Sequence, residues 1–175
     1  MDLNLKGKKA LVYGSSQGIG KSIAQSLVKE EVEVCLCSRN KQSLQLALEE
    51  TKAQHFVTAD LSQKGEALTA LKKAMNLMKG VDIIVFNTGG PQKGSFAEIE
   101  SSQWRTDFES LYMSVIDPLK HCLPLMKENK FGRVLIITSI AAKEPLANLT
   151  TSNVYRAGLP GLVRTLSNEY SKDNI

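Results

Sequence analysis

Short apolar runs and helically spaced apolar stripes alternate along this chain. The runs have the length of buried strands, whereas the stripes repeat every three to four residues, as on one face of a helix. The strand-like runs cover residues 9–13, 32–37, 55–61, 81–86 and 133–138. Helical segments follow the first run and also lie at 38–52, 67–78, 111–126 and 159–166.

This alternation predicts a parallel sheet covered by helices on both faces, because each strand–helix–strand unit forms a right-handed crossover. The fourth run, VDIIVF, is mostly apolar, which is typical of a strand buried on both faces. We therefore predict a doubly wound α/β fold in a single domain over 1–175. Ligands of such sheets bind at the carboxyl ends of the strands.

The stretch KALVYGSSQGIG, residues 9–20, predicts a strand, a tight turn and a helix. Gly14 suits a backbone conformation that a side chain would resist. Gly18 leaves room for a ligand beside the backbone, and Gly20 lets the helix pack close to the strand. The free N–H groups of such a helix start bind phosphate groups. The spacing differs from the common G-x-G-x-x-G, so an ordinary glycine-rich turn is the alternative interpretation.

Composition narrows the class of protein. The 175 residues carry a net charge of +4 in scattered positions, which gives no basic patch for nucleic acid. No apolar run approaches a membrane span, and the first residues resemble no secretion signal. Cys35, Cys37 and Cys122 have neither metal nor redox spacing, so we expect buried free thiols and a cytoplasmic protein.

Candidate binding residues follow each predicted strand: Gly14, Arg39, Asp60, Asn87 and Ser139. The second strand has no carboxylate at its end to bind the ribose 2′-hydroxyl of NAD. The guanidinium of Arg39 instead suits the 2′-phosphate of NADP. We therefore predict NADP(H) rather than NAD(H), and a solvated loop charge is the alternative interpretation of Arg39.

These motifs together make the chain similar to the short-chain dehydrogenase/reductase family, and in particular to its beta-ketoacyl reductase-like branch. The matching segments are GSSQGIG at 14–20, Asp60-Leu61, Asn87 to Gly90, Ile136 to Ser139, and the helix after Arg156. The resemblance implies a Rossmann-like fold. It also implies a cofactor site formed by Gly14, Ser16, Gln17, Gly18, Ile19, Gly20, Arg39, Asp60, Leu61, Asn87 and Gly89, with no metal.

The catalytic positions depart from that family, which uses a serine, a Tyr-x-x-x-Lys motif and an asparagine. Ser139 is the matching serine, Ser152 falls at the tyrosine position and Arg156 at the lysine position. The asparagine position holds Leu111, or Ser110 with a slip of one residue. A divergent branch with S-N-x-x-R and N-T-G-G-P motifs is the better match.

The proton donor is therefore open at this point. Arg156 suits ribose hydroxyls but stays charged, and the hydroxyl of Ser152 is too weakly acidic for a general acid. Tyr155 is the alternative donor, although it lies three residues after the tyrosine position and is therefore rotated by about 60° and shifted by roughly 4.5 Å along the helix.

We expect an NADP(H)-dependent oxidoreductase acting on a small-molecule carbonyl/alcohol pair. A dinucleotide-binding sensor or scaffold without turnover is the alternative, and a related α/β fold without nucleotide is a third, less favoured one. The resemblance also implies a homo-oligomer, paired through the long helix around 102–128 and the last helix. The family continues with further strands, so we expect a C-terminally incomplete chain whose strand 133–138 is a bare apolar edge.

Overall fold

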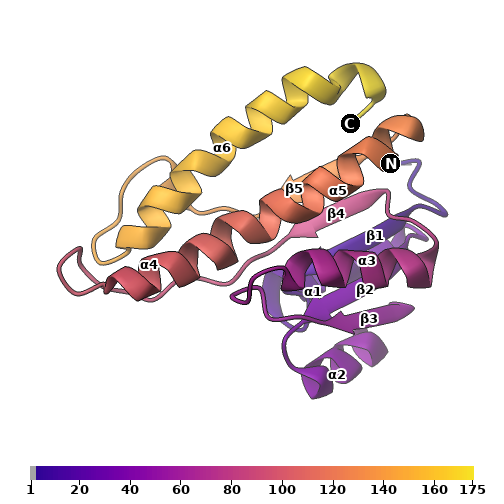
Figure 1. The fold of residues 1–175 in the computed structure, drawn as a ribbon. Coiled ribbons are helices and arrows are strands. Elements are labelled where there is room, and N and C mark those ends of the chain that lie inside the picture. The colour runs from indigo at the N-terminus through magenta and orange to yellow at the C-terminus, as the bar shows by residue number, and fades with distance from the viewer. Residues whose placement is uncertain (1–2) are drawn as a thin grey trace.

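The computed structural model describes residues 3–175, which form a parallel sheet with helices on both faces (Figure 1). The strands are β1 Lys9–Tyr13, β2 Glu33–Ser38, β3 His55–Thr58, β4 Ile83–Phe86 and β5 Arg133–Ile136. They pair in the order β3-β2-β1-β4-β5, and every neighbouring pair is parallel. The order reverses at β1, so the predicted doubly wound α/β fold is confirmed.

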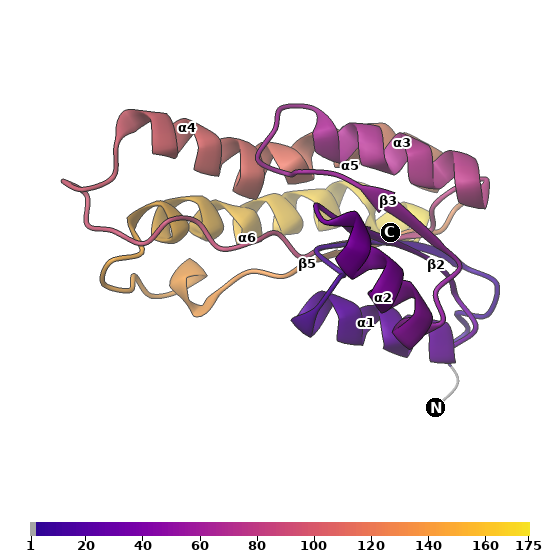
Figure 2. The same cartoon turned by 90° about the horizontal axis from the view of Figure 1, so that it is seen from below.

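The helices divide between the two faces of the sheet (Figure 2). They are α1 Gly18–Lys29, α2 Lys41–Thr51, α3 Glu66–Met78, α4 Ser101–Phe108, α5 Ser114–Glu128 and α6 Thr150–Tyr170. Helices α1 and α2 cover one face, and α3 and α5 cover the other. Helix α6 lies on the β5 side of the sheet, and its Leu162, Leu166 and Tyr170 pack against the core under α3 and α5.

The alternation of side chains along β1 builds a core on each face. Ala10 and Val12 belong to the cluster under α1 and α2, whereas Leu11 and Tyr13 belong to the cluster under α3 and α5. The ring of Tyr13 stacks on Phe86 with centroids 5.3 Å apart. Its hydroxyl donates to the carbonyl oxygen of Ala67 at 2.6 Å, so the buried phenol is paired.

Several boundaries differ from the sequence predictions. β3 ends at Thr58 rather than at residue 61, because Asp60 and Ser62 form a turn. β4 begins at Ile83. The preceding Asp82 makes two hydrogen bonds with the backbone of Lys9: its carboxylate accepts from the Lys9 N–H, and its own N–H donates to the Lys9 carbonyl oxygen. Helix α5 continues through Pro118 and Pro124. Upstream of it, residues 109–113 form a π-helix between α4 and α5.

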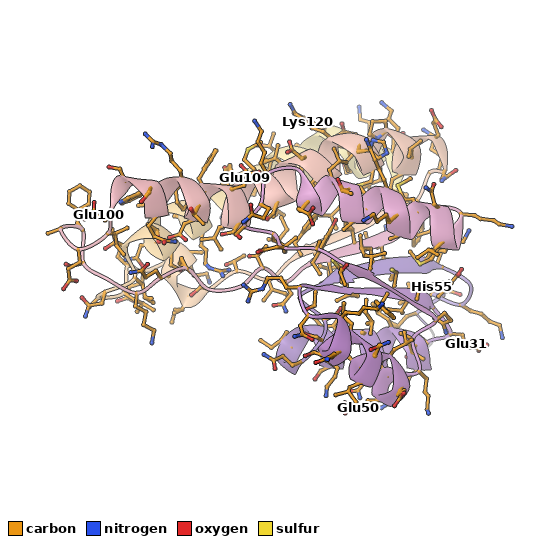
Figure 3. All side chains as sticks on the ribbon, turned by 60° about the horizontal axis from the view of Figure 1, so that its bottom comes forward. Glu31, Glu50, His55, Glu100, Glu109 and Lys120 are labelled. Atoms are coloured by element: carbon orange, nitrogen blue, oxygen red, sulfur yellow. The ribbon has the colours of Figure 1, made fainter. Side chains whose placement is uncertain are left out.

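The two ends of the sheet are distinct in Figure 3. His55 at the start of β3 lies near Glu31 at one end of the molecule, and Glu100 before α4 lies at the other. On β5, which is an edge strand of the sheet, the side chain of Leu135 is 44% exposed. Within residues 3–175, no helix is long and apolar enough to cross a membrane.

Candidate functional site

The turn after β1 is built against the end of β4. Gly14 has a φ of +62°, and a Cβ at this position would lie 2.1 Å from the carbonyl oxygen of Asn87. The side-chain amide of Asn87 donates to the carbonyl oxygen of Gly14 at 2.9 Å. Only glycine fits this close approach, so the turn and the end of β4 form one rigid unit.

The start of α1 offers free backbone N–H groups. Gln17, which precedes the helix, makes no side-chain cap bond, so the first-turn donors keep their hydrogen-bonding capacity. A Cβ on Gly20 would lie 2.3 Å from the carbonyl oxygen of Gly14, which explains why α1 starts so close to β1. Around Gly18 no heavy atom lies within 4 Å of an added Cβ, so the helix start is open to a ligand.

A cleft of about 550 Å³ runs across the carboxyl ends of the strands from this turn to α4. The cleft brings together most of the residues that the sequence predicts for a cofactor site. Those that line it are Gly14, Ser16, Gln17, Gly18, Ile19, Arg39, Asp60, Leu61, Asn87 and Gly89. Gly20 lies behind this surface and serves the packing of α1 on the turn.

The β2 side of the cleft is polar and carries a positive charge. The hydroxyls of Ser16 and Ser38 lie 2.9 Å apart, which ties the glycine turn to the end of β2. Arg39 follows directly, is exposed, and makes no ion pair or hydrogen bond within residues 3–175. Its guanidinium is therefore available to a ligand, as expected for a residue that binds a phosphate.

The other end of the cleft carries a buried carboxylate that the sequence analysis missed. Asp107 on α4 is only 2% exposed and lines the cleft together with Gln103, Thr106 and Ser110. It accepts hydrogen bonds from Gln103 Nε2 at 2.8 Å and from Thr151 Oγ1 at 2.6 Å. Asp107 lies one helical turn before Leu111, on the same face of the helix as the predicted apolar stripe. A carboxylate in line with such a stripe is the sequence signal that could have identified it.

Ser139 lies just after β5, where the chain leaves the sheet. Its Oγ accepts a hydrogen bond from the backbone N–H of Ala141 at 3.2 Å and so caps the 3₁₀ turn over 140–142. The side chain is half-buried and its rotamer is held by this bond. The hydroxyl hydrogen stays free to donate to a ligand.

Arg156 and Ser152 share the buried face of α6, at 6% and 4% exposure. Arg156 donates from Nη1 to the carbonyl oxygen of Ile137 at 3.0 Å and from Nη2 to that of Gly89 at 3.2 Å. Burial lowers the pKa of its guanidinium. The side chain therefore joins α6 to the segments that leave β4 and β5.

Tyr155, the alternative proton donor, is held against α4. Its hydroxyl donates to the carbonyl oxygen of Trp104 at 3.0 Å, and its ring packs edge-on against Trp104 with centroids 5.8 Å apart. Burial, and to a smaller extent Asp107, raises the pKa of this phenol. Tyr155, like Ser139, Ser152 and Arg156, is absent from the lining of the cleft, and its hydroxyl is already bound to the carbonyl oxygen of Trp104. Leu111, at the asparagine position, is buried in the π-helix.

Comparison with known proteins agrees with this geometry. A family model described as short chain dehydrogenase matches residues 8–175. The uncharacterized oxidoreductase YvrD of Bacillus subtilis is 32% identical, and the match covers 100% of this chain and 67% of that protein.

Two solved structures superpose closely. A 3-oxoacyl (acyl-carrier-protein) reductase from Agrobacterium tumefaciens with NADP bound has a TM-score of 0.93 at 26% identity, with 98% of this chain and 67% of that chain covered. The L-sorbose reductase of Gluconobacter frateurii, complexed with NADPH and L-sorbose, has a TM-score of 0.92 at 29% identity, with 100% and 68% covered. The chain thus spans about two thirds of the length of these relatives.

Proposed function

Because this chain belongs to the short-chain dehydrogenase family, we propose that it is an oxidoreductase that uses NADP(H) to interconvert a carbonyl group and an alcohol. The observation that carries the proposal is the cleft across the strand ends. It joins the open start of α1, the free guanidinium of Arg39 and the loop after β4 in one continuous surface.

The residues present fit a dinucleotide. The uncapped N–H groups of α1, beside the open space at Gly18, suit a pyrophosphate. Arg39, with the hydroxyls of Ser16 and Ser38 nearby, suits a 2′-phosphate. No carboxylate follows β2 to compete with that phosphate. NADP or NADPH is bound in the reductase structures compared above, which favours the same cofactor here.

The chemistry divides between cofactor and protein. When bound, the nicotinamide supplies or accepts the hydride. The backbone N–H of Ala141 orients the Ser139 hydroxyl, which donates a hydrogen bond to the substrate oxygen. This hydrogen bond polarises the carbonyl group. Arg156 holds α6 against the loops after β4 and β5. No side chain is assigned as the proton donor in this proposal, because the Ser152 hydroxyl is too weakly acidic and the Tyr155 hydroxyl is bound to Trp104.

The test is NADPH oxidation, followed by its absorbance, with a panel of ketoses, 3-oxoacyl thioesters, aryl ketones and oxo acids. The proposal expects NADPH binding and oxidation with at least one class. Absence of binding to both NADPH and NADH would contradict it.

A dinucleotide-binding protein without turnover is the second candidate. It is favoured by one specific observation. Within residues 3–175 no tyrosine lines the cleft, and the hydroxyl of Tyr155 donates its hydrogen bond to the carbonyl oxygen of Trp104 on α4. Such a sensor or scaffold would bind NADPH but leave it unoxidised with every carbonyl in the panel.

We also propose a homo-oligomer that pairs through α4, α5 and α6. These helices expose apolar side chains, with Phe108 40%, Val154 53% and Val163 41% exposed. Sedimentation velocity at increasing concentration tests this proposal, and a monomer at all concentrations would contradict it.

A further inference from the structure

The side chain of Asn153 pairs with the backbone of a residue in the loop before its own helix. Its Oδ1 accepts from the backbone N–H of Leu146 at 3.1 Å, and its Nδ2 donates to the carbonyl oxygen of Leu146 at 2.9 Å. Asn153 is the asparagine of the S-N-x-x-R motif and lies in the first turn of α6. One amide thus satisfies both backbone polar groups of a single loop residue.

The loop that Asn153 holds runs from the end of β5 to the start of α6 (Figure 2). Residues 143–148 are all exposed, so burial of apolar surface contributes little to its conformation. Its later part is tied to the loop after β4. The carbonyl oxygen of Asn148 accepts from the N–H of Gly94 at 2.9 Å, and Thr150 Oγ1 donates to the carbonyl oxygen of Gly94 at 3.0 Å. Polar contacts therefore set the path of this loop.

Ser139 opens the loop, and its geometry depends on how the loop continues. The 3₁₀ turn over 140–142 has only three residues, and the N–H of Ala141 donates to Ser139 Oγ within it. So short a turn is marginal by itself and is stabilised by the segments on either side. β5 fixes one end of the turn, and the pair of Asn153 with Leu146 fixes the chain that leaves the other end.

We propose that Asn153 is a positioning residue for Ser139. This inference rests on the proposed function, in which Ser139 donates to the substrate oxygen. Asn153 acts through the loop: while it holds Leu146, the turn over 140–142 stays closed and Ala141 keeps the Ser139 hydroxyl in one orientation. Without this pair the exposed loop opens more often, and the hydroxyl is correctly placed for a smaller fraction of the time.

The first test follows hydrogen exchange at single backbone amides by NMR, in the chain without ligand. The amide of Ala141 reports its bond to Ser139 directly. Asn153→Ala should speed exchange at Ala141 about tenfold, the effect of losing one to two hydrogen bonds. Asn168→Ala is the matched control and should leave this rate unchanged, because Asn168 is exposed on the same helix and its side chain makes no hydrogen bond within residues 3–175.

The urea dependence of exchange separates this local role from a general loss of stability. A local opening exposes little surface, so the rate at Ala141 in Asn153→Ala should not change with urea below the unfolding transition. Unchanged exchange at Ala141 would overturn the inference. Faster exchange that rises steeply with urea would overturn it as well, since Asn153 would then stabilise the whole fold and not the turn.

A kinetic readout connects the loop to the chemical step. It uses the compound of the carbonyl panel above that oxidises NADPH fastest. Asn153→Ala should lower kcat about tenfold, and its affinity for NADPH, measured by fluorescence, should stay within about twofold of the wild type. Asn153→Asp keeps an acceptor for the N–H of Leu146 and should give an intermediate kcat. Normal kcat in Asn153→Ala would contradict the inference.

The failure of this inference can be told apart from that of the proposed function. If no compound of the panel oxidises NADPH, the proposed function fails, and exchange at Ala141 alone decides whether Asn153 holds Ser139 in place. If the wild type turns over and Asn153→Ala matches it, only this inference fails. Should Asn153→Ala not fold, Asn153→Asp takes its place, with exchange at Ala141 expected to be about threefold faster than in the wild type. An unchanged rate in that variant would count against the inference.

Discussion

The side-chain amide of Asn87 donates to the carbonyl oxygen of Gly14 at 2.9 Å, and this bond holds the end of β4 against the turn that begins α1. The two residues are 73 positions apart in the sequence. Their contact brings the predicted phosphate-binding turn and the loop after β4 into one site.

Gly14→Ala should destabilise the fold. The added Cβ would meet the carbonyl oxygen of Asn87 at 2.1 Å in a backbone conformation that alanine resists. We expect a loss of about 3 kcal/mol in the free energy of unfolding, measured by urea denaturation. Gly18→Ala is the matched control, because its Cβ meets no atom within 4 Å, and it should cost only about 1–2 kcal/mol. Equal losses would contradict this account of the turn.

Arg39→Ala should change the choice of cofactor. Removing the free guanidinium at the end of β2 is expected to weaken NADPH about tenfold and to leave NADH almost unchanged. Fluorescence titration with both nucleotides measures the ratio. Lys41→Ala is a suitable control, since Lys41 is exposed and does not line the cleft. Parallel losses for both nucleotides would show that Arg39 does not recognise the 2′-phosphate.

Ser139→Ala should reduce the turnover of NADPH about 100-fold, because one donor to the substrate oxygen is lost. NADPH affinity should stay the same, which locates the effect in the chemical step. Ser139→Thr keeps the hydroxyl and should recover most of the activity. An Ser139→Ala variant with normal turnover would exclude this role.

Asp107 and Thr151 should be energetically coupled. Asp107→Ala leaves Thr151 and Gln103 without their acceptor and is expected to cost about 1–3 kcal/mol. A double-mutant cycle with Thr151→Val, followed by urea denaturation, should give a coupling of about 1 kcal/mol or more. Additive losses would mean that the bond between α4 and α6 adds no stability.

The buried thiols should make the stability of the folded chain sensitive to alkaline pH. Burial raises the pKa of Cys35 and of Cys122 to about 12, so their neutral forms are favoured in the folded chain. This stability is fully present below the unfolded thiol pKa of about 8.5 and is lost as pH rises toward the folded values. Denaturation at increasing pH should therefore show a falling free energy of unfolding. Ellman's reagent at about pH 8 should detect no thiol until the chain is unfolded, and rapid reaction of the folded protein would contradict the burial of the cysteines.

The fold and the nucleotide half of the site could be predicted from the sequence. Strand and helix periodicities are local signals, and parallel strands place their carboxyl ends at one edge. Residues as distant as Gly14, Asp60 and Asn87 therefore had to meet, and they line one cleft.

The rest depends on contacts between distant segments. No local pattern indicates that Tyr155 donates to Trp104, 51 residues away, rather than toward a substrate. The partners of Asp107 and Arg156 are likewise set by how α6 packs on α4 and on the loops after β4 and β5. Substrate-side chemistry was therefore harder to predict than the cofactor site.

The most direct test of the central claim is a fluorescence titration of the wild-type chain with NADPH and NADH. The cleft with its open α1 start and Arg39 predicts saturable binding of NADPH, about tenfold tighter than that of NADH. If neither nucleotide binds, the assignment of this cleft as a dinucleotide site is contradicted.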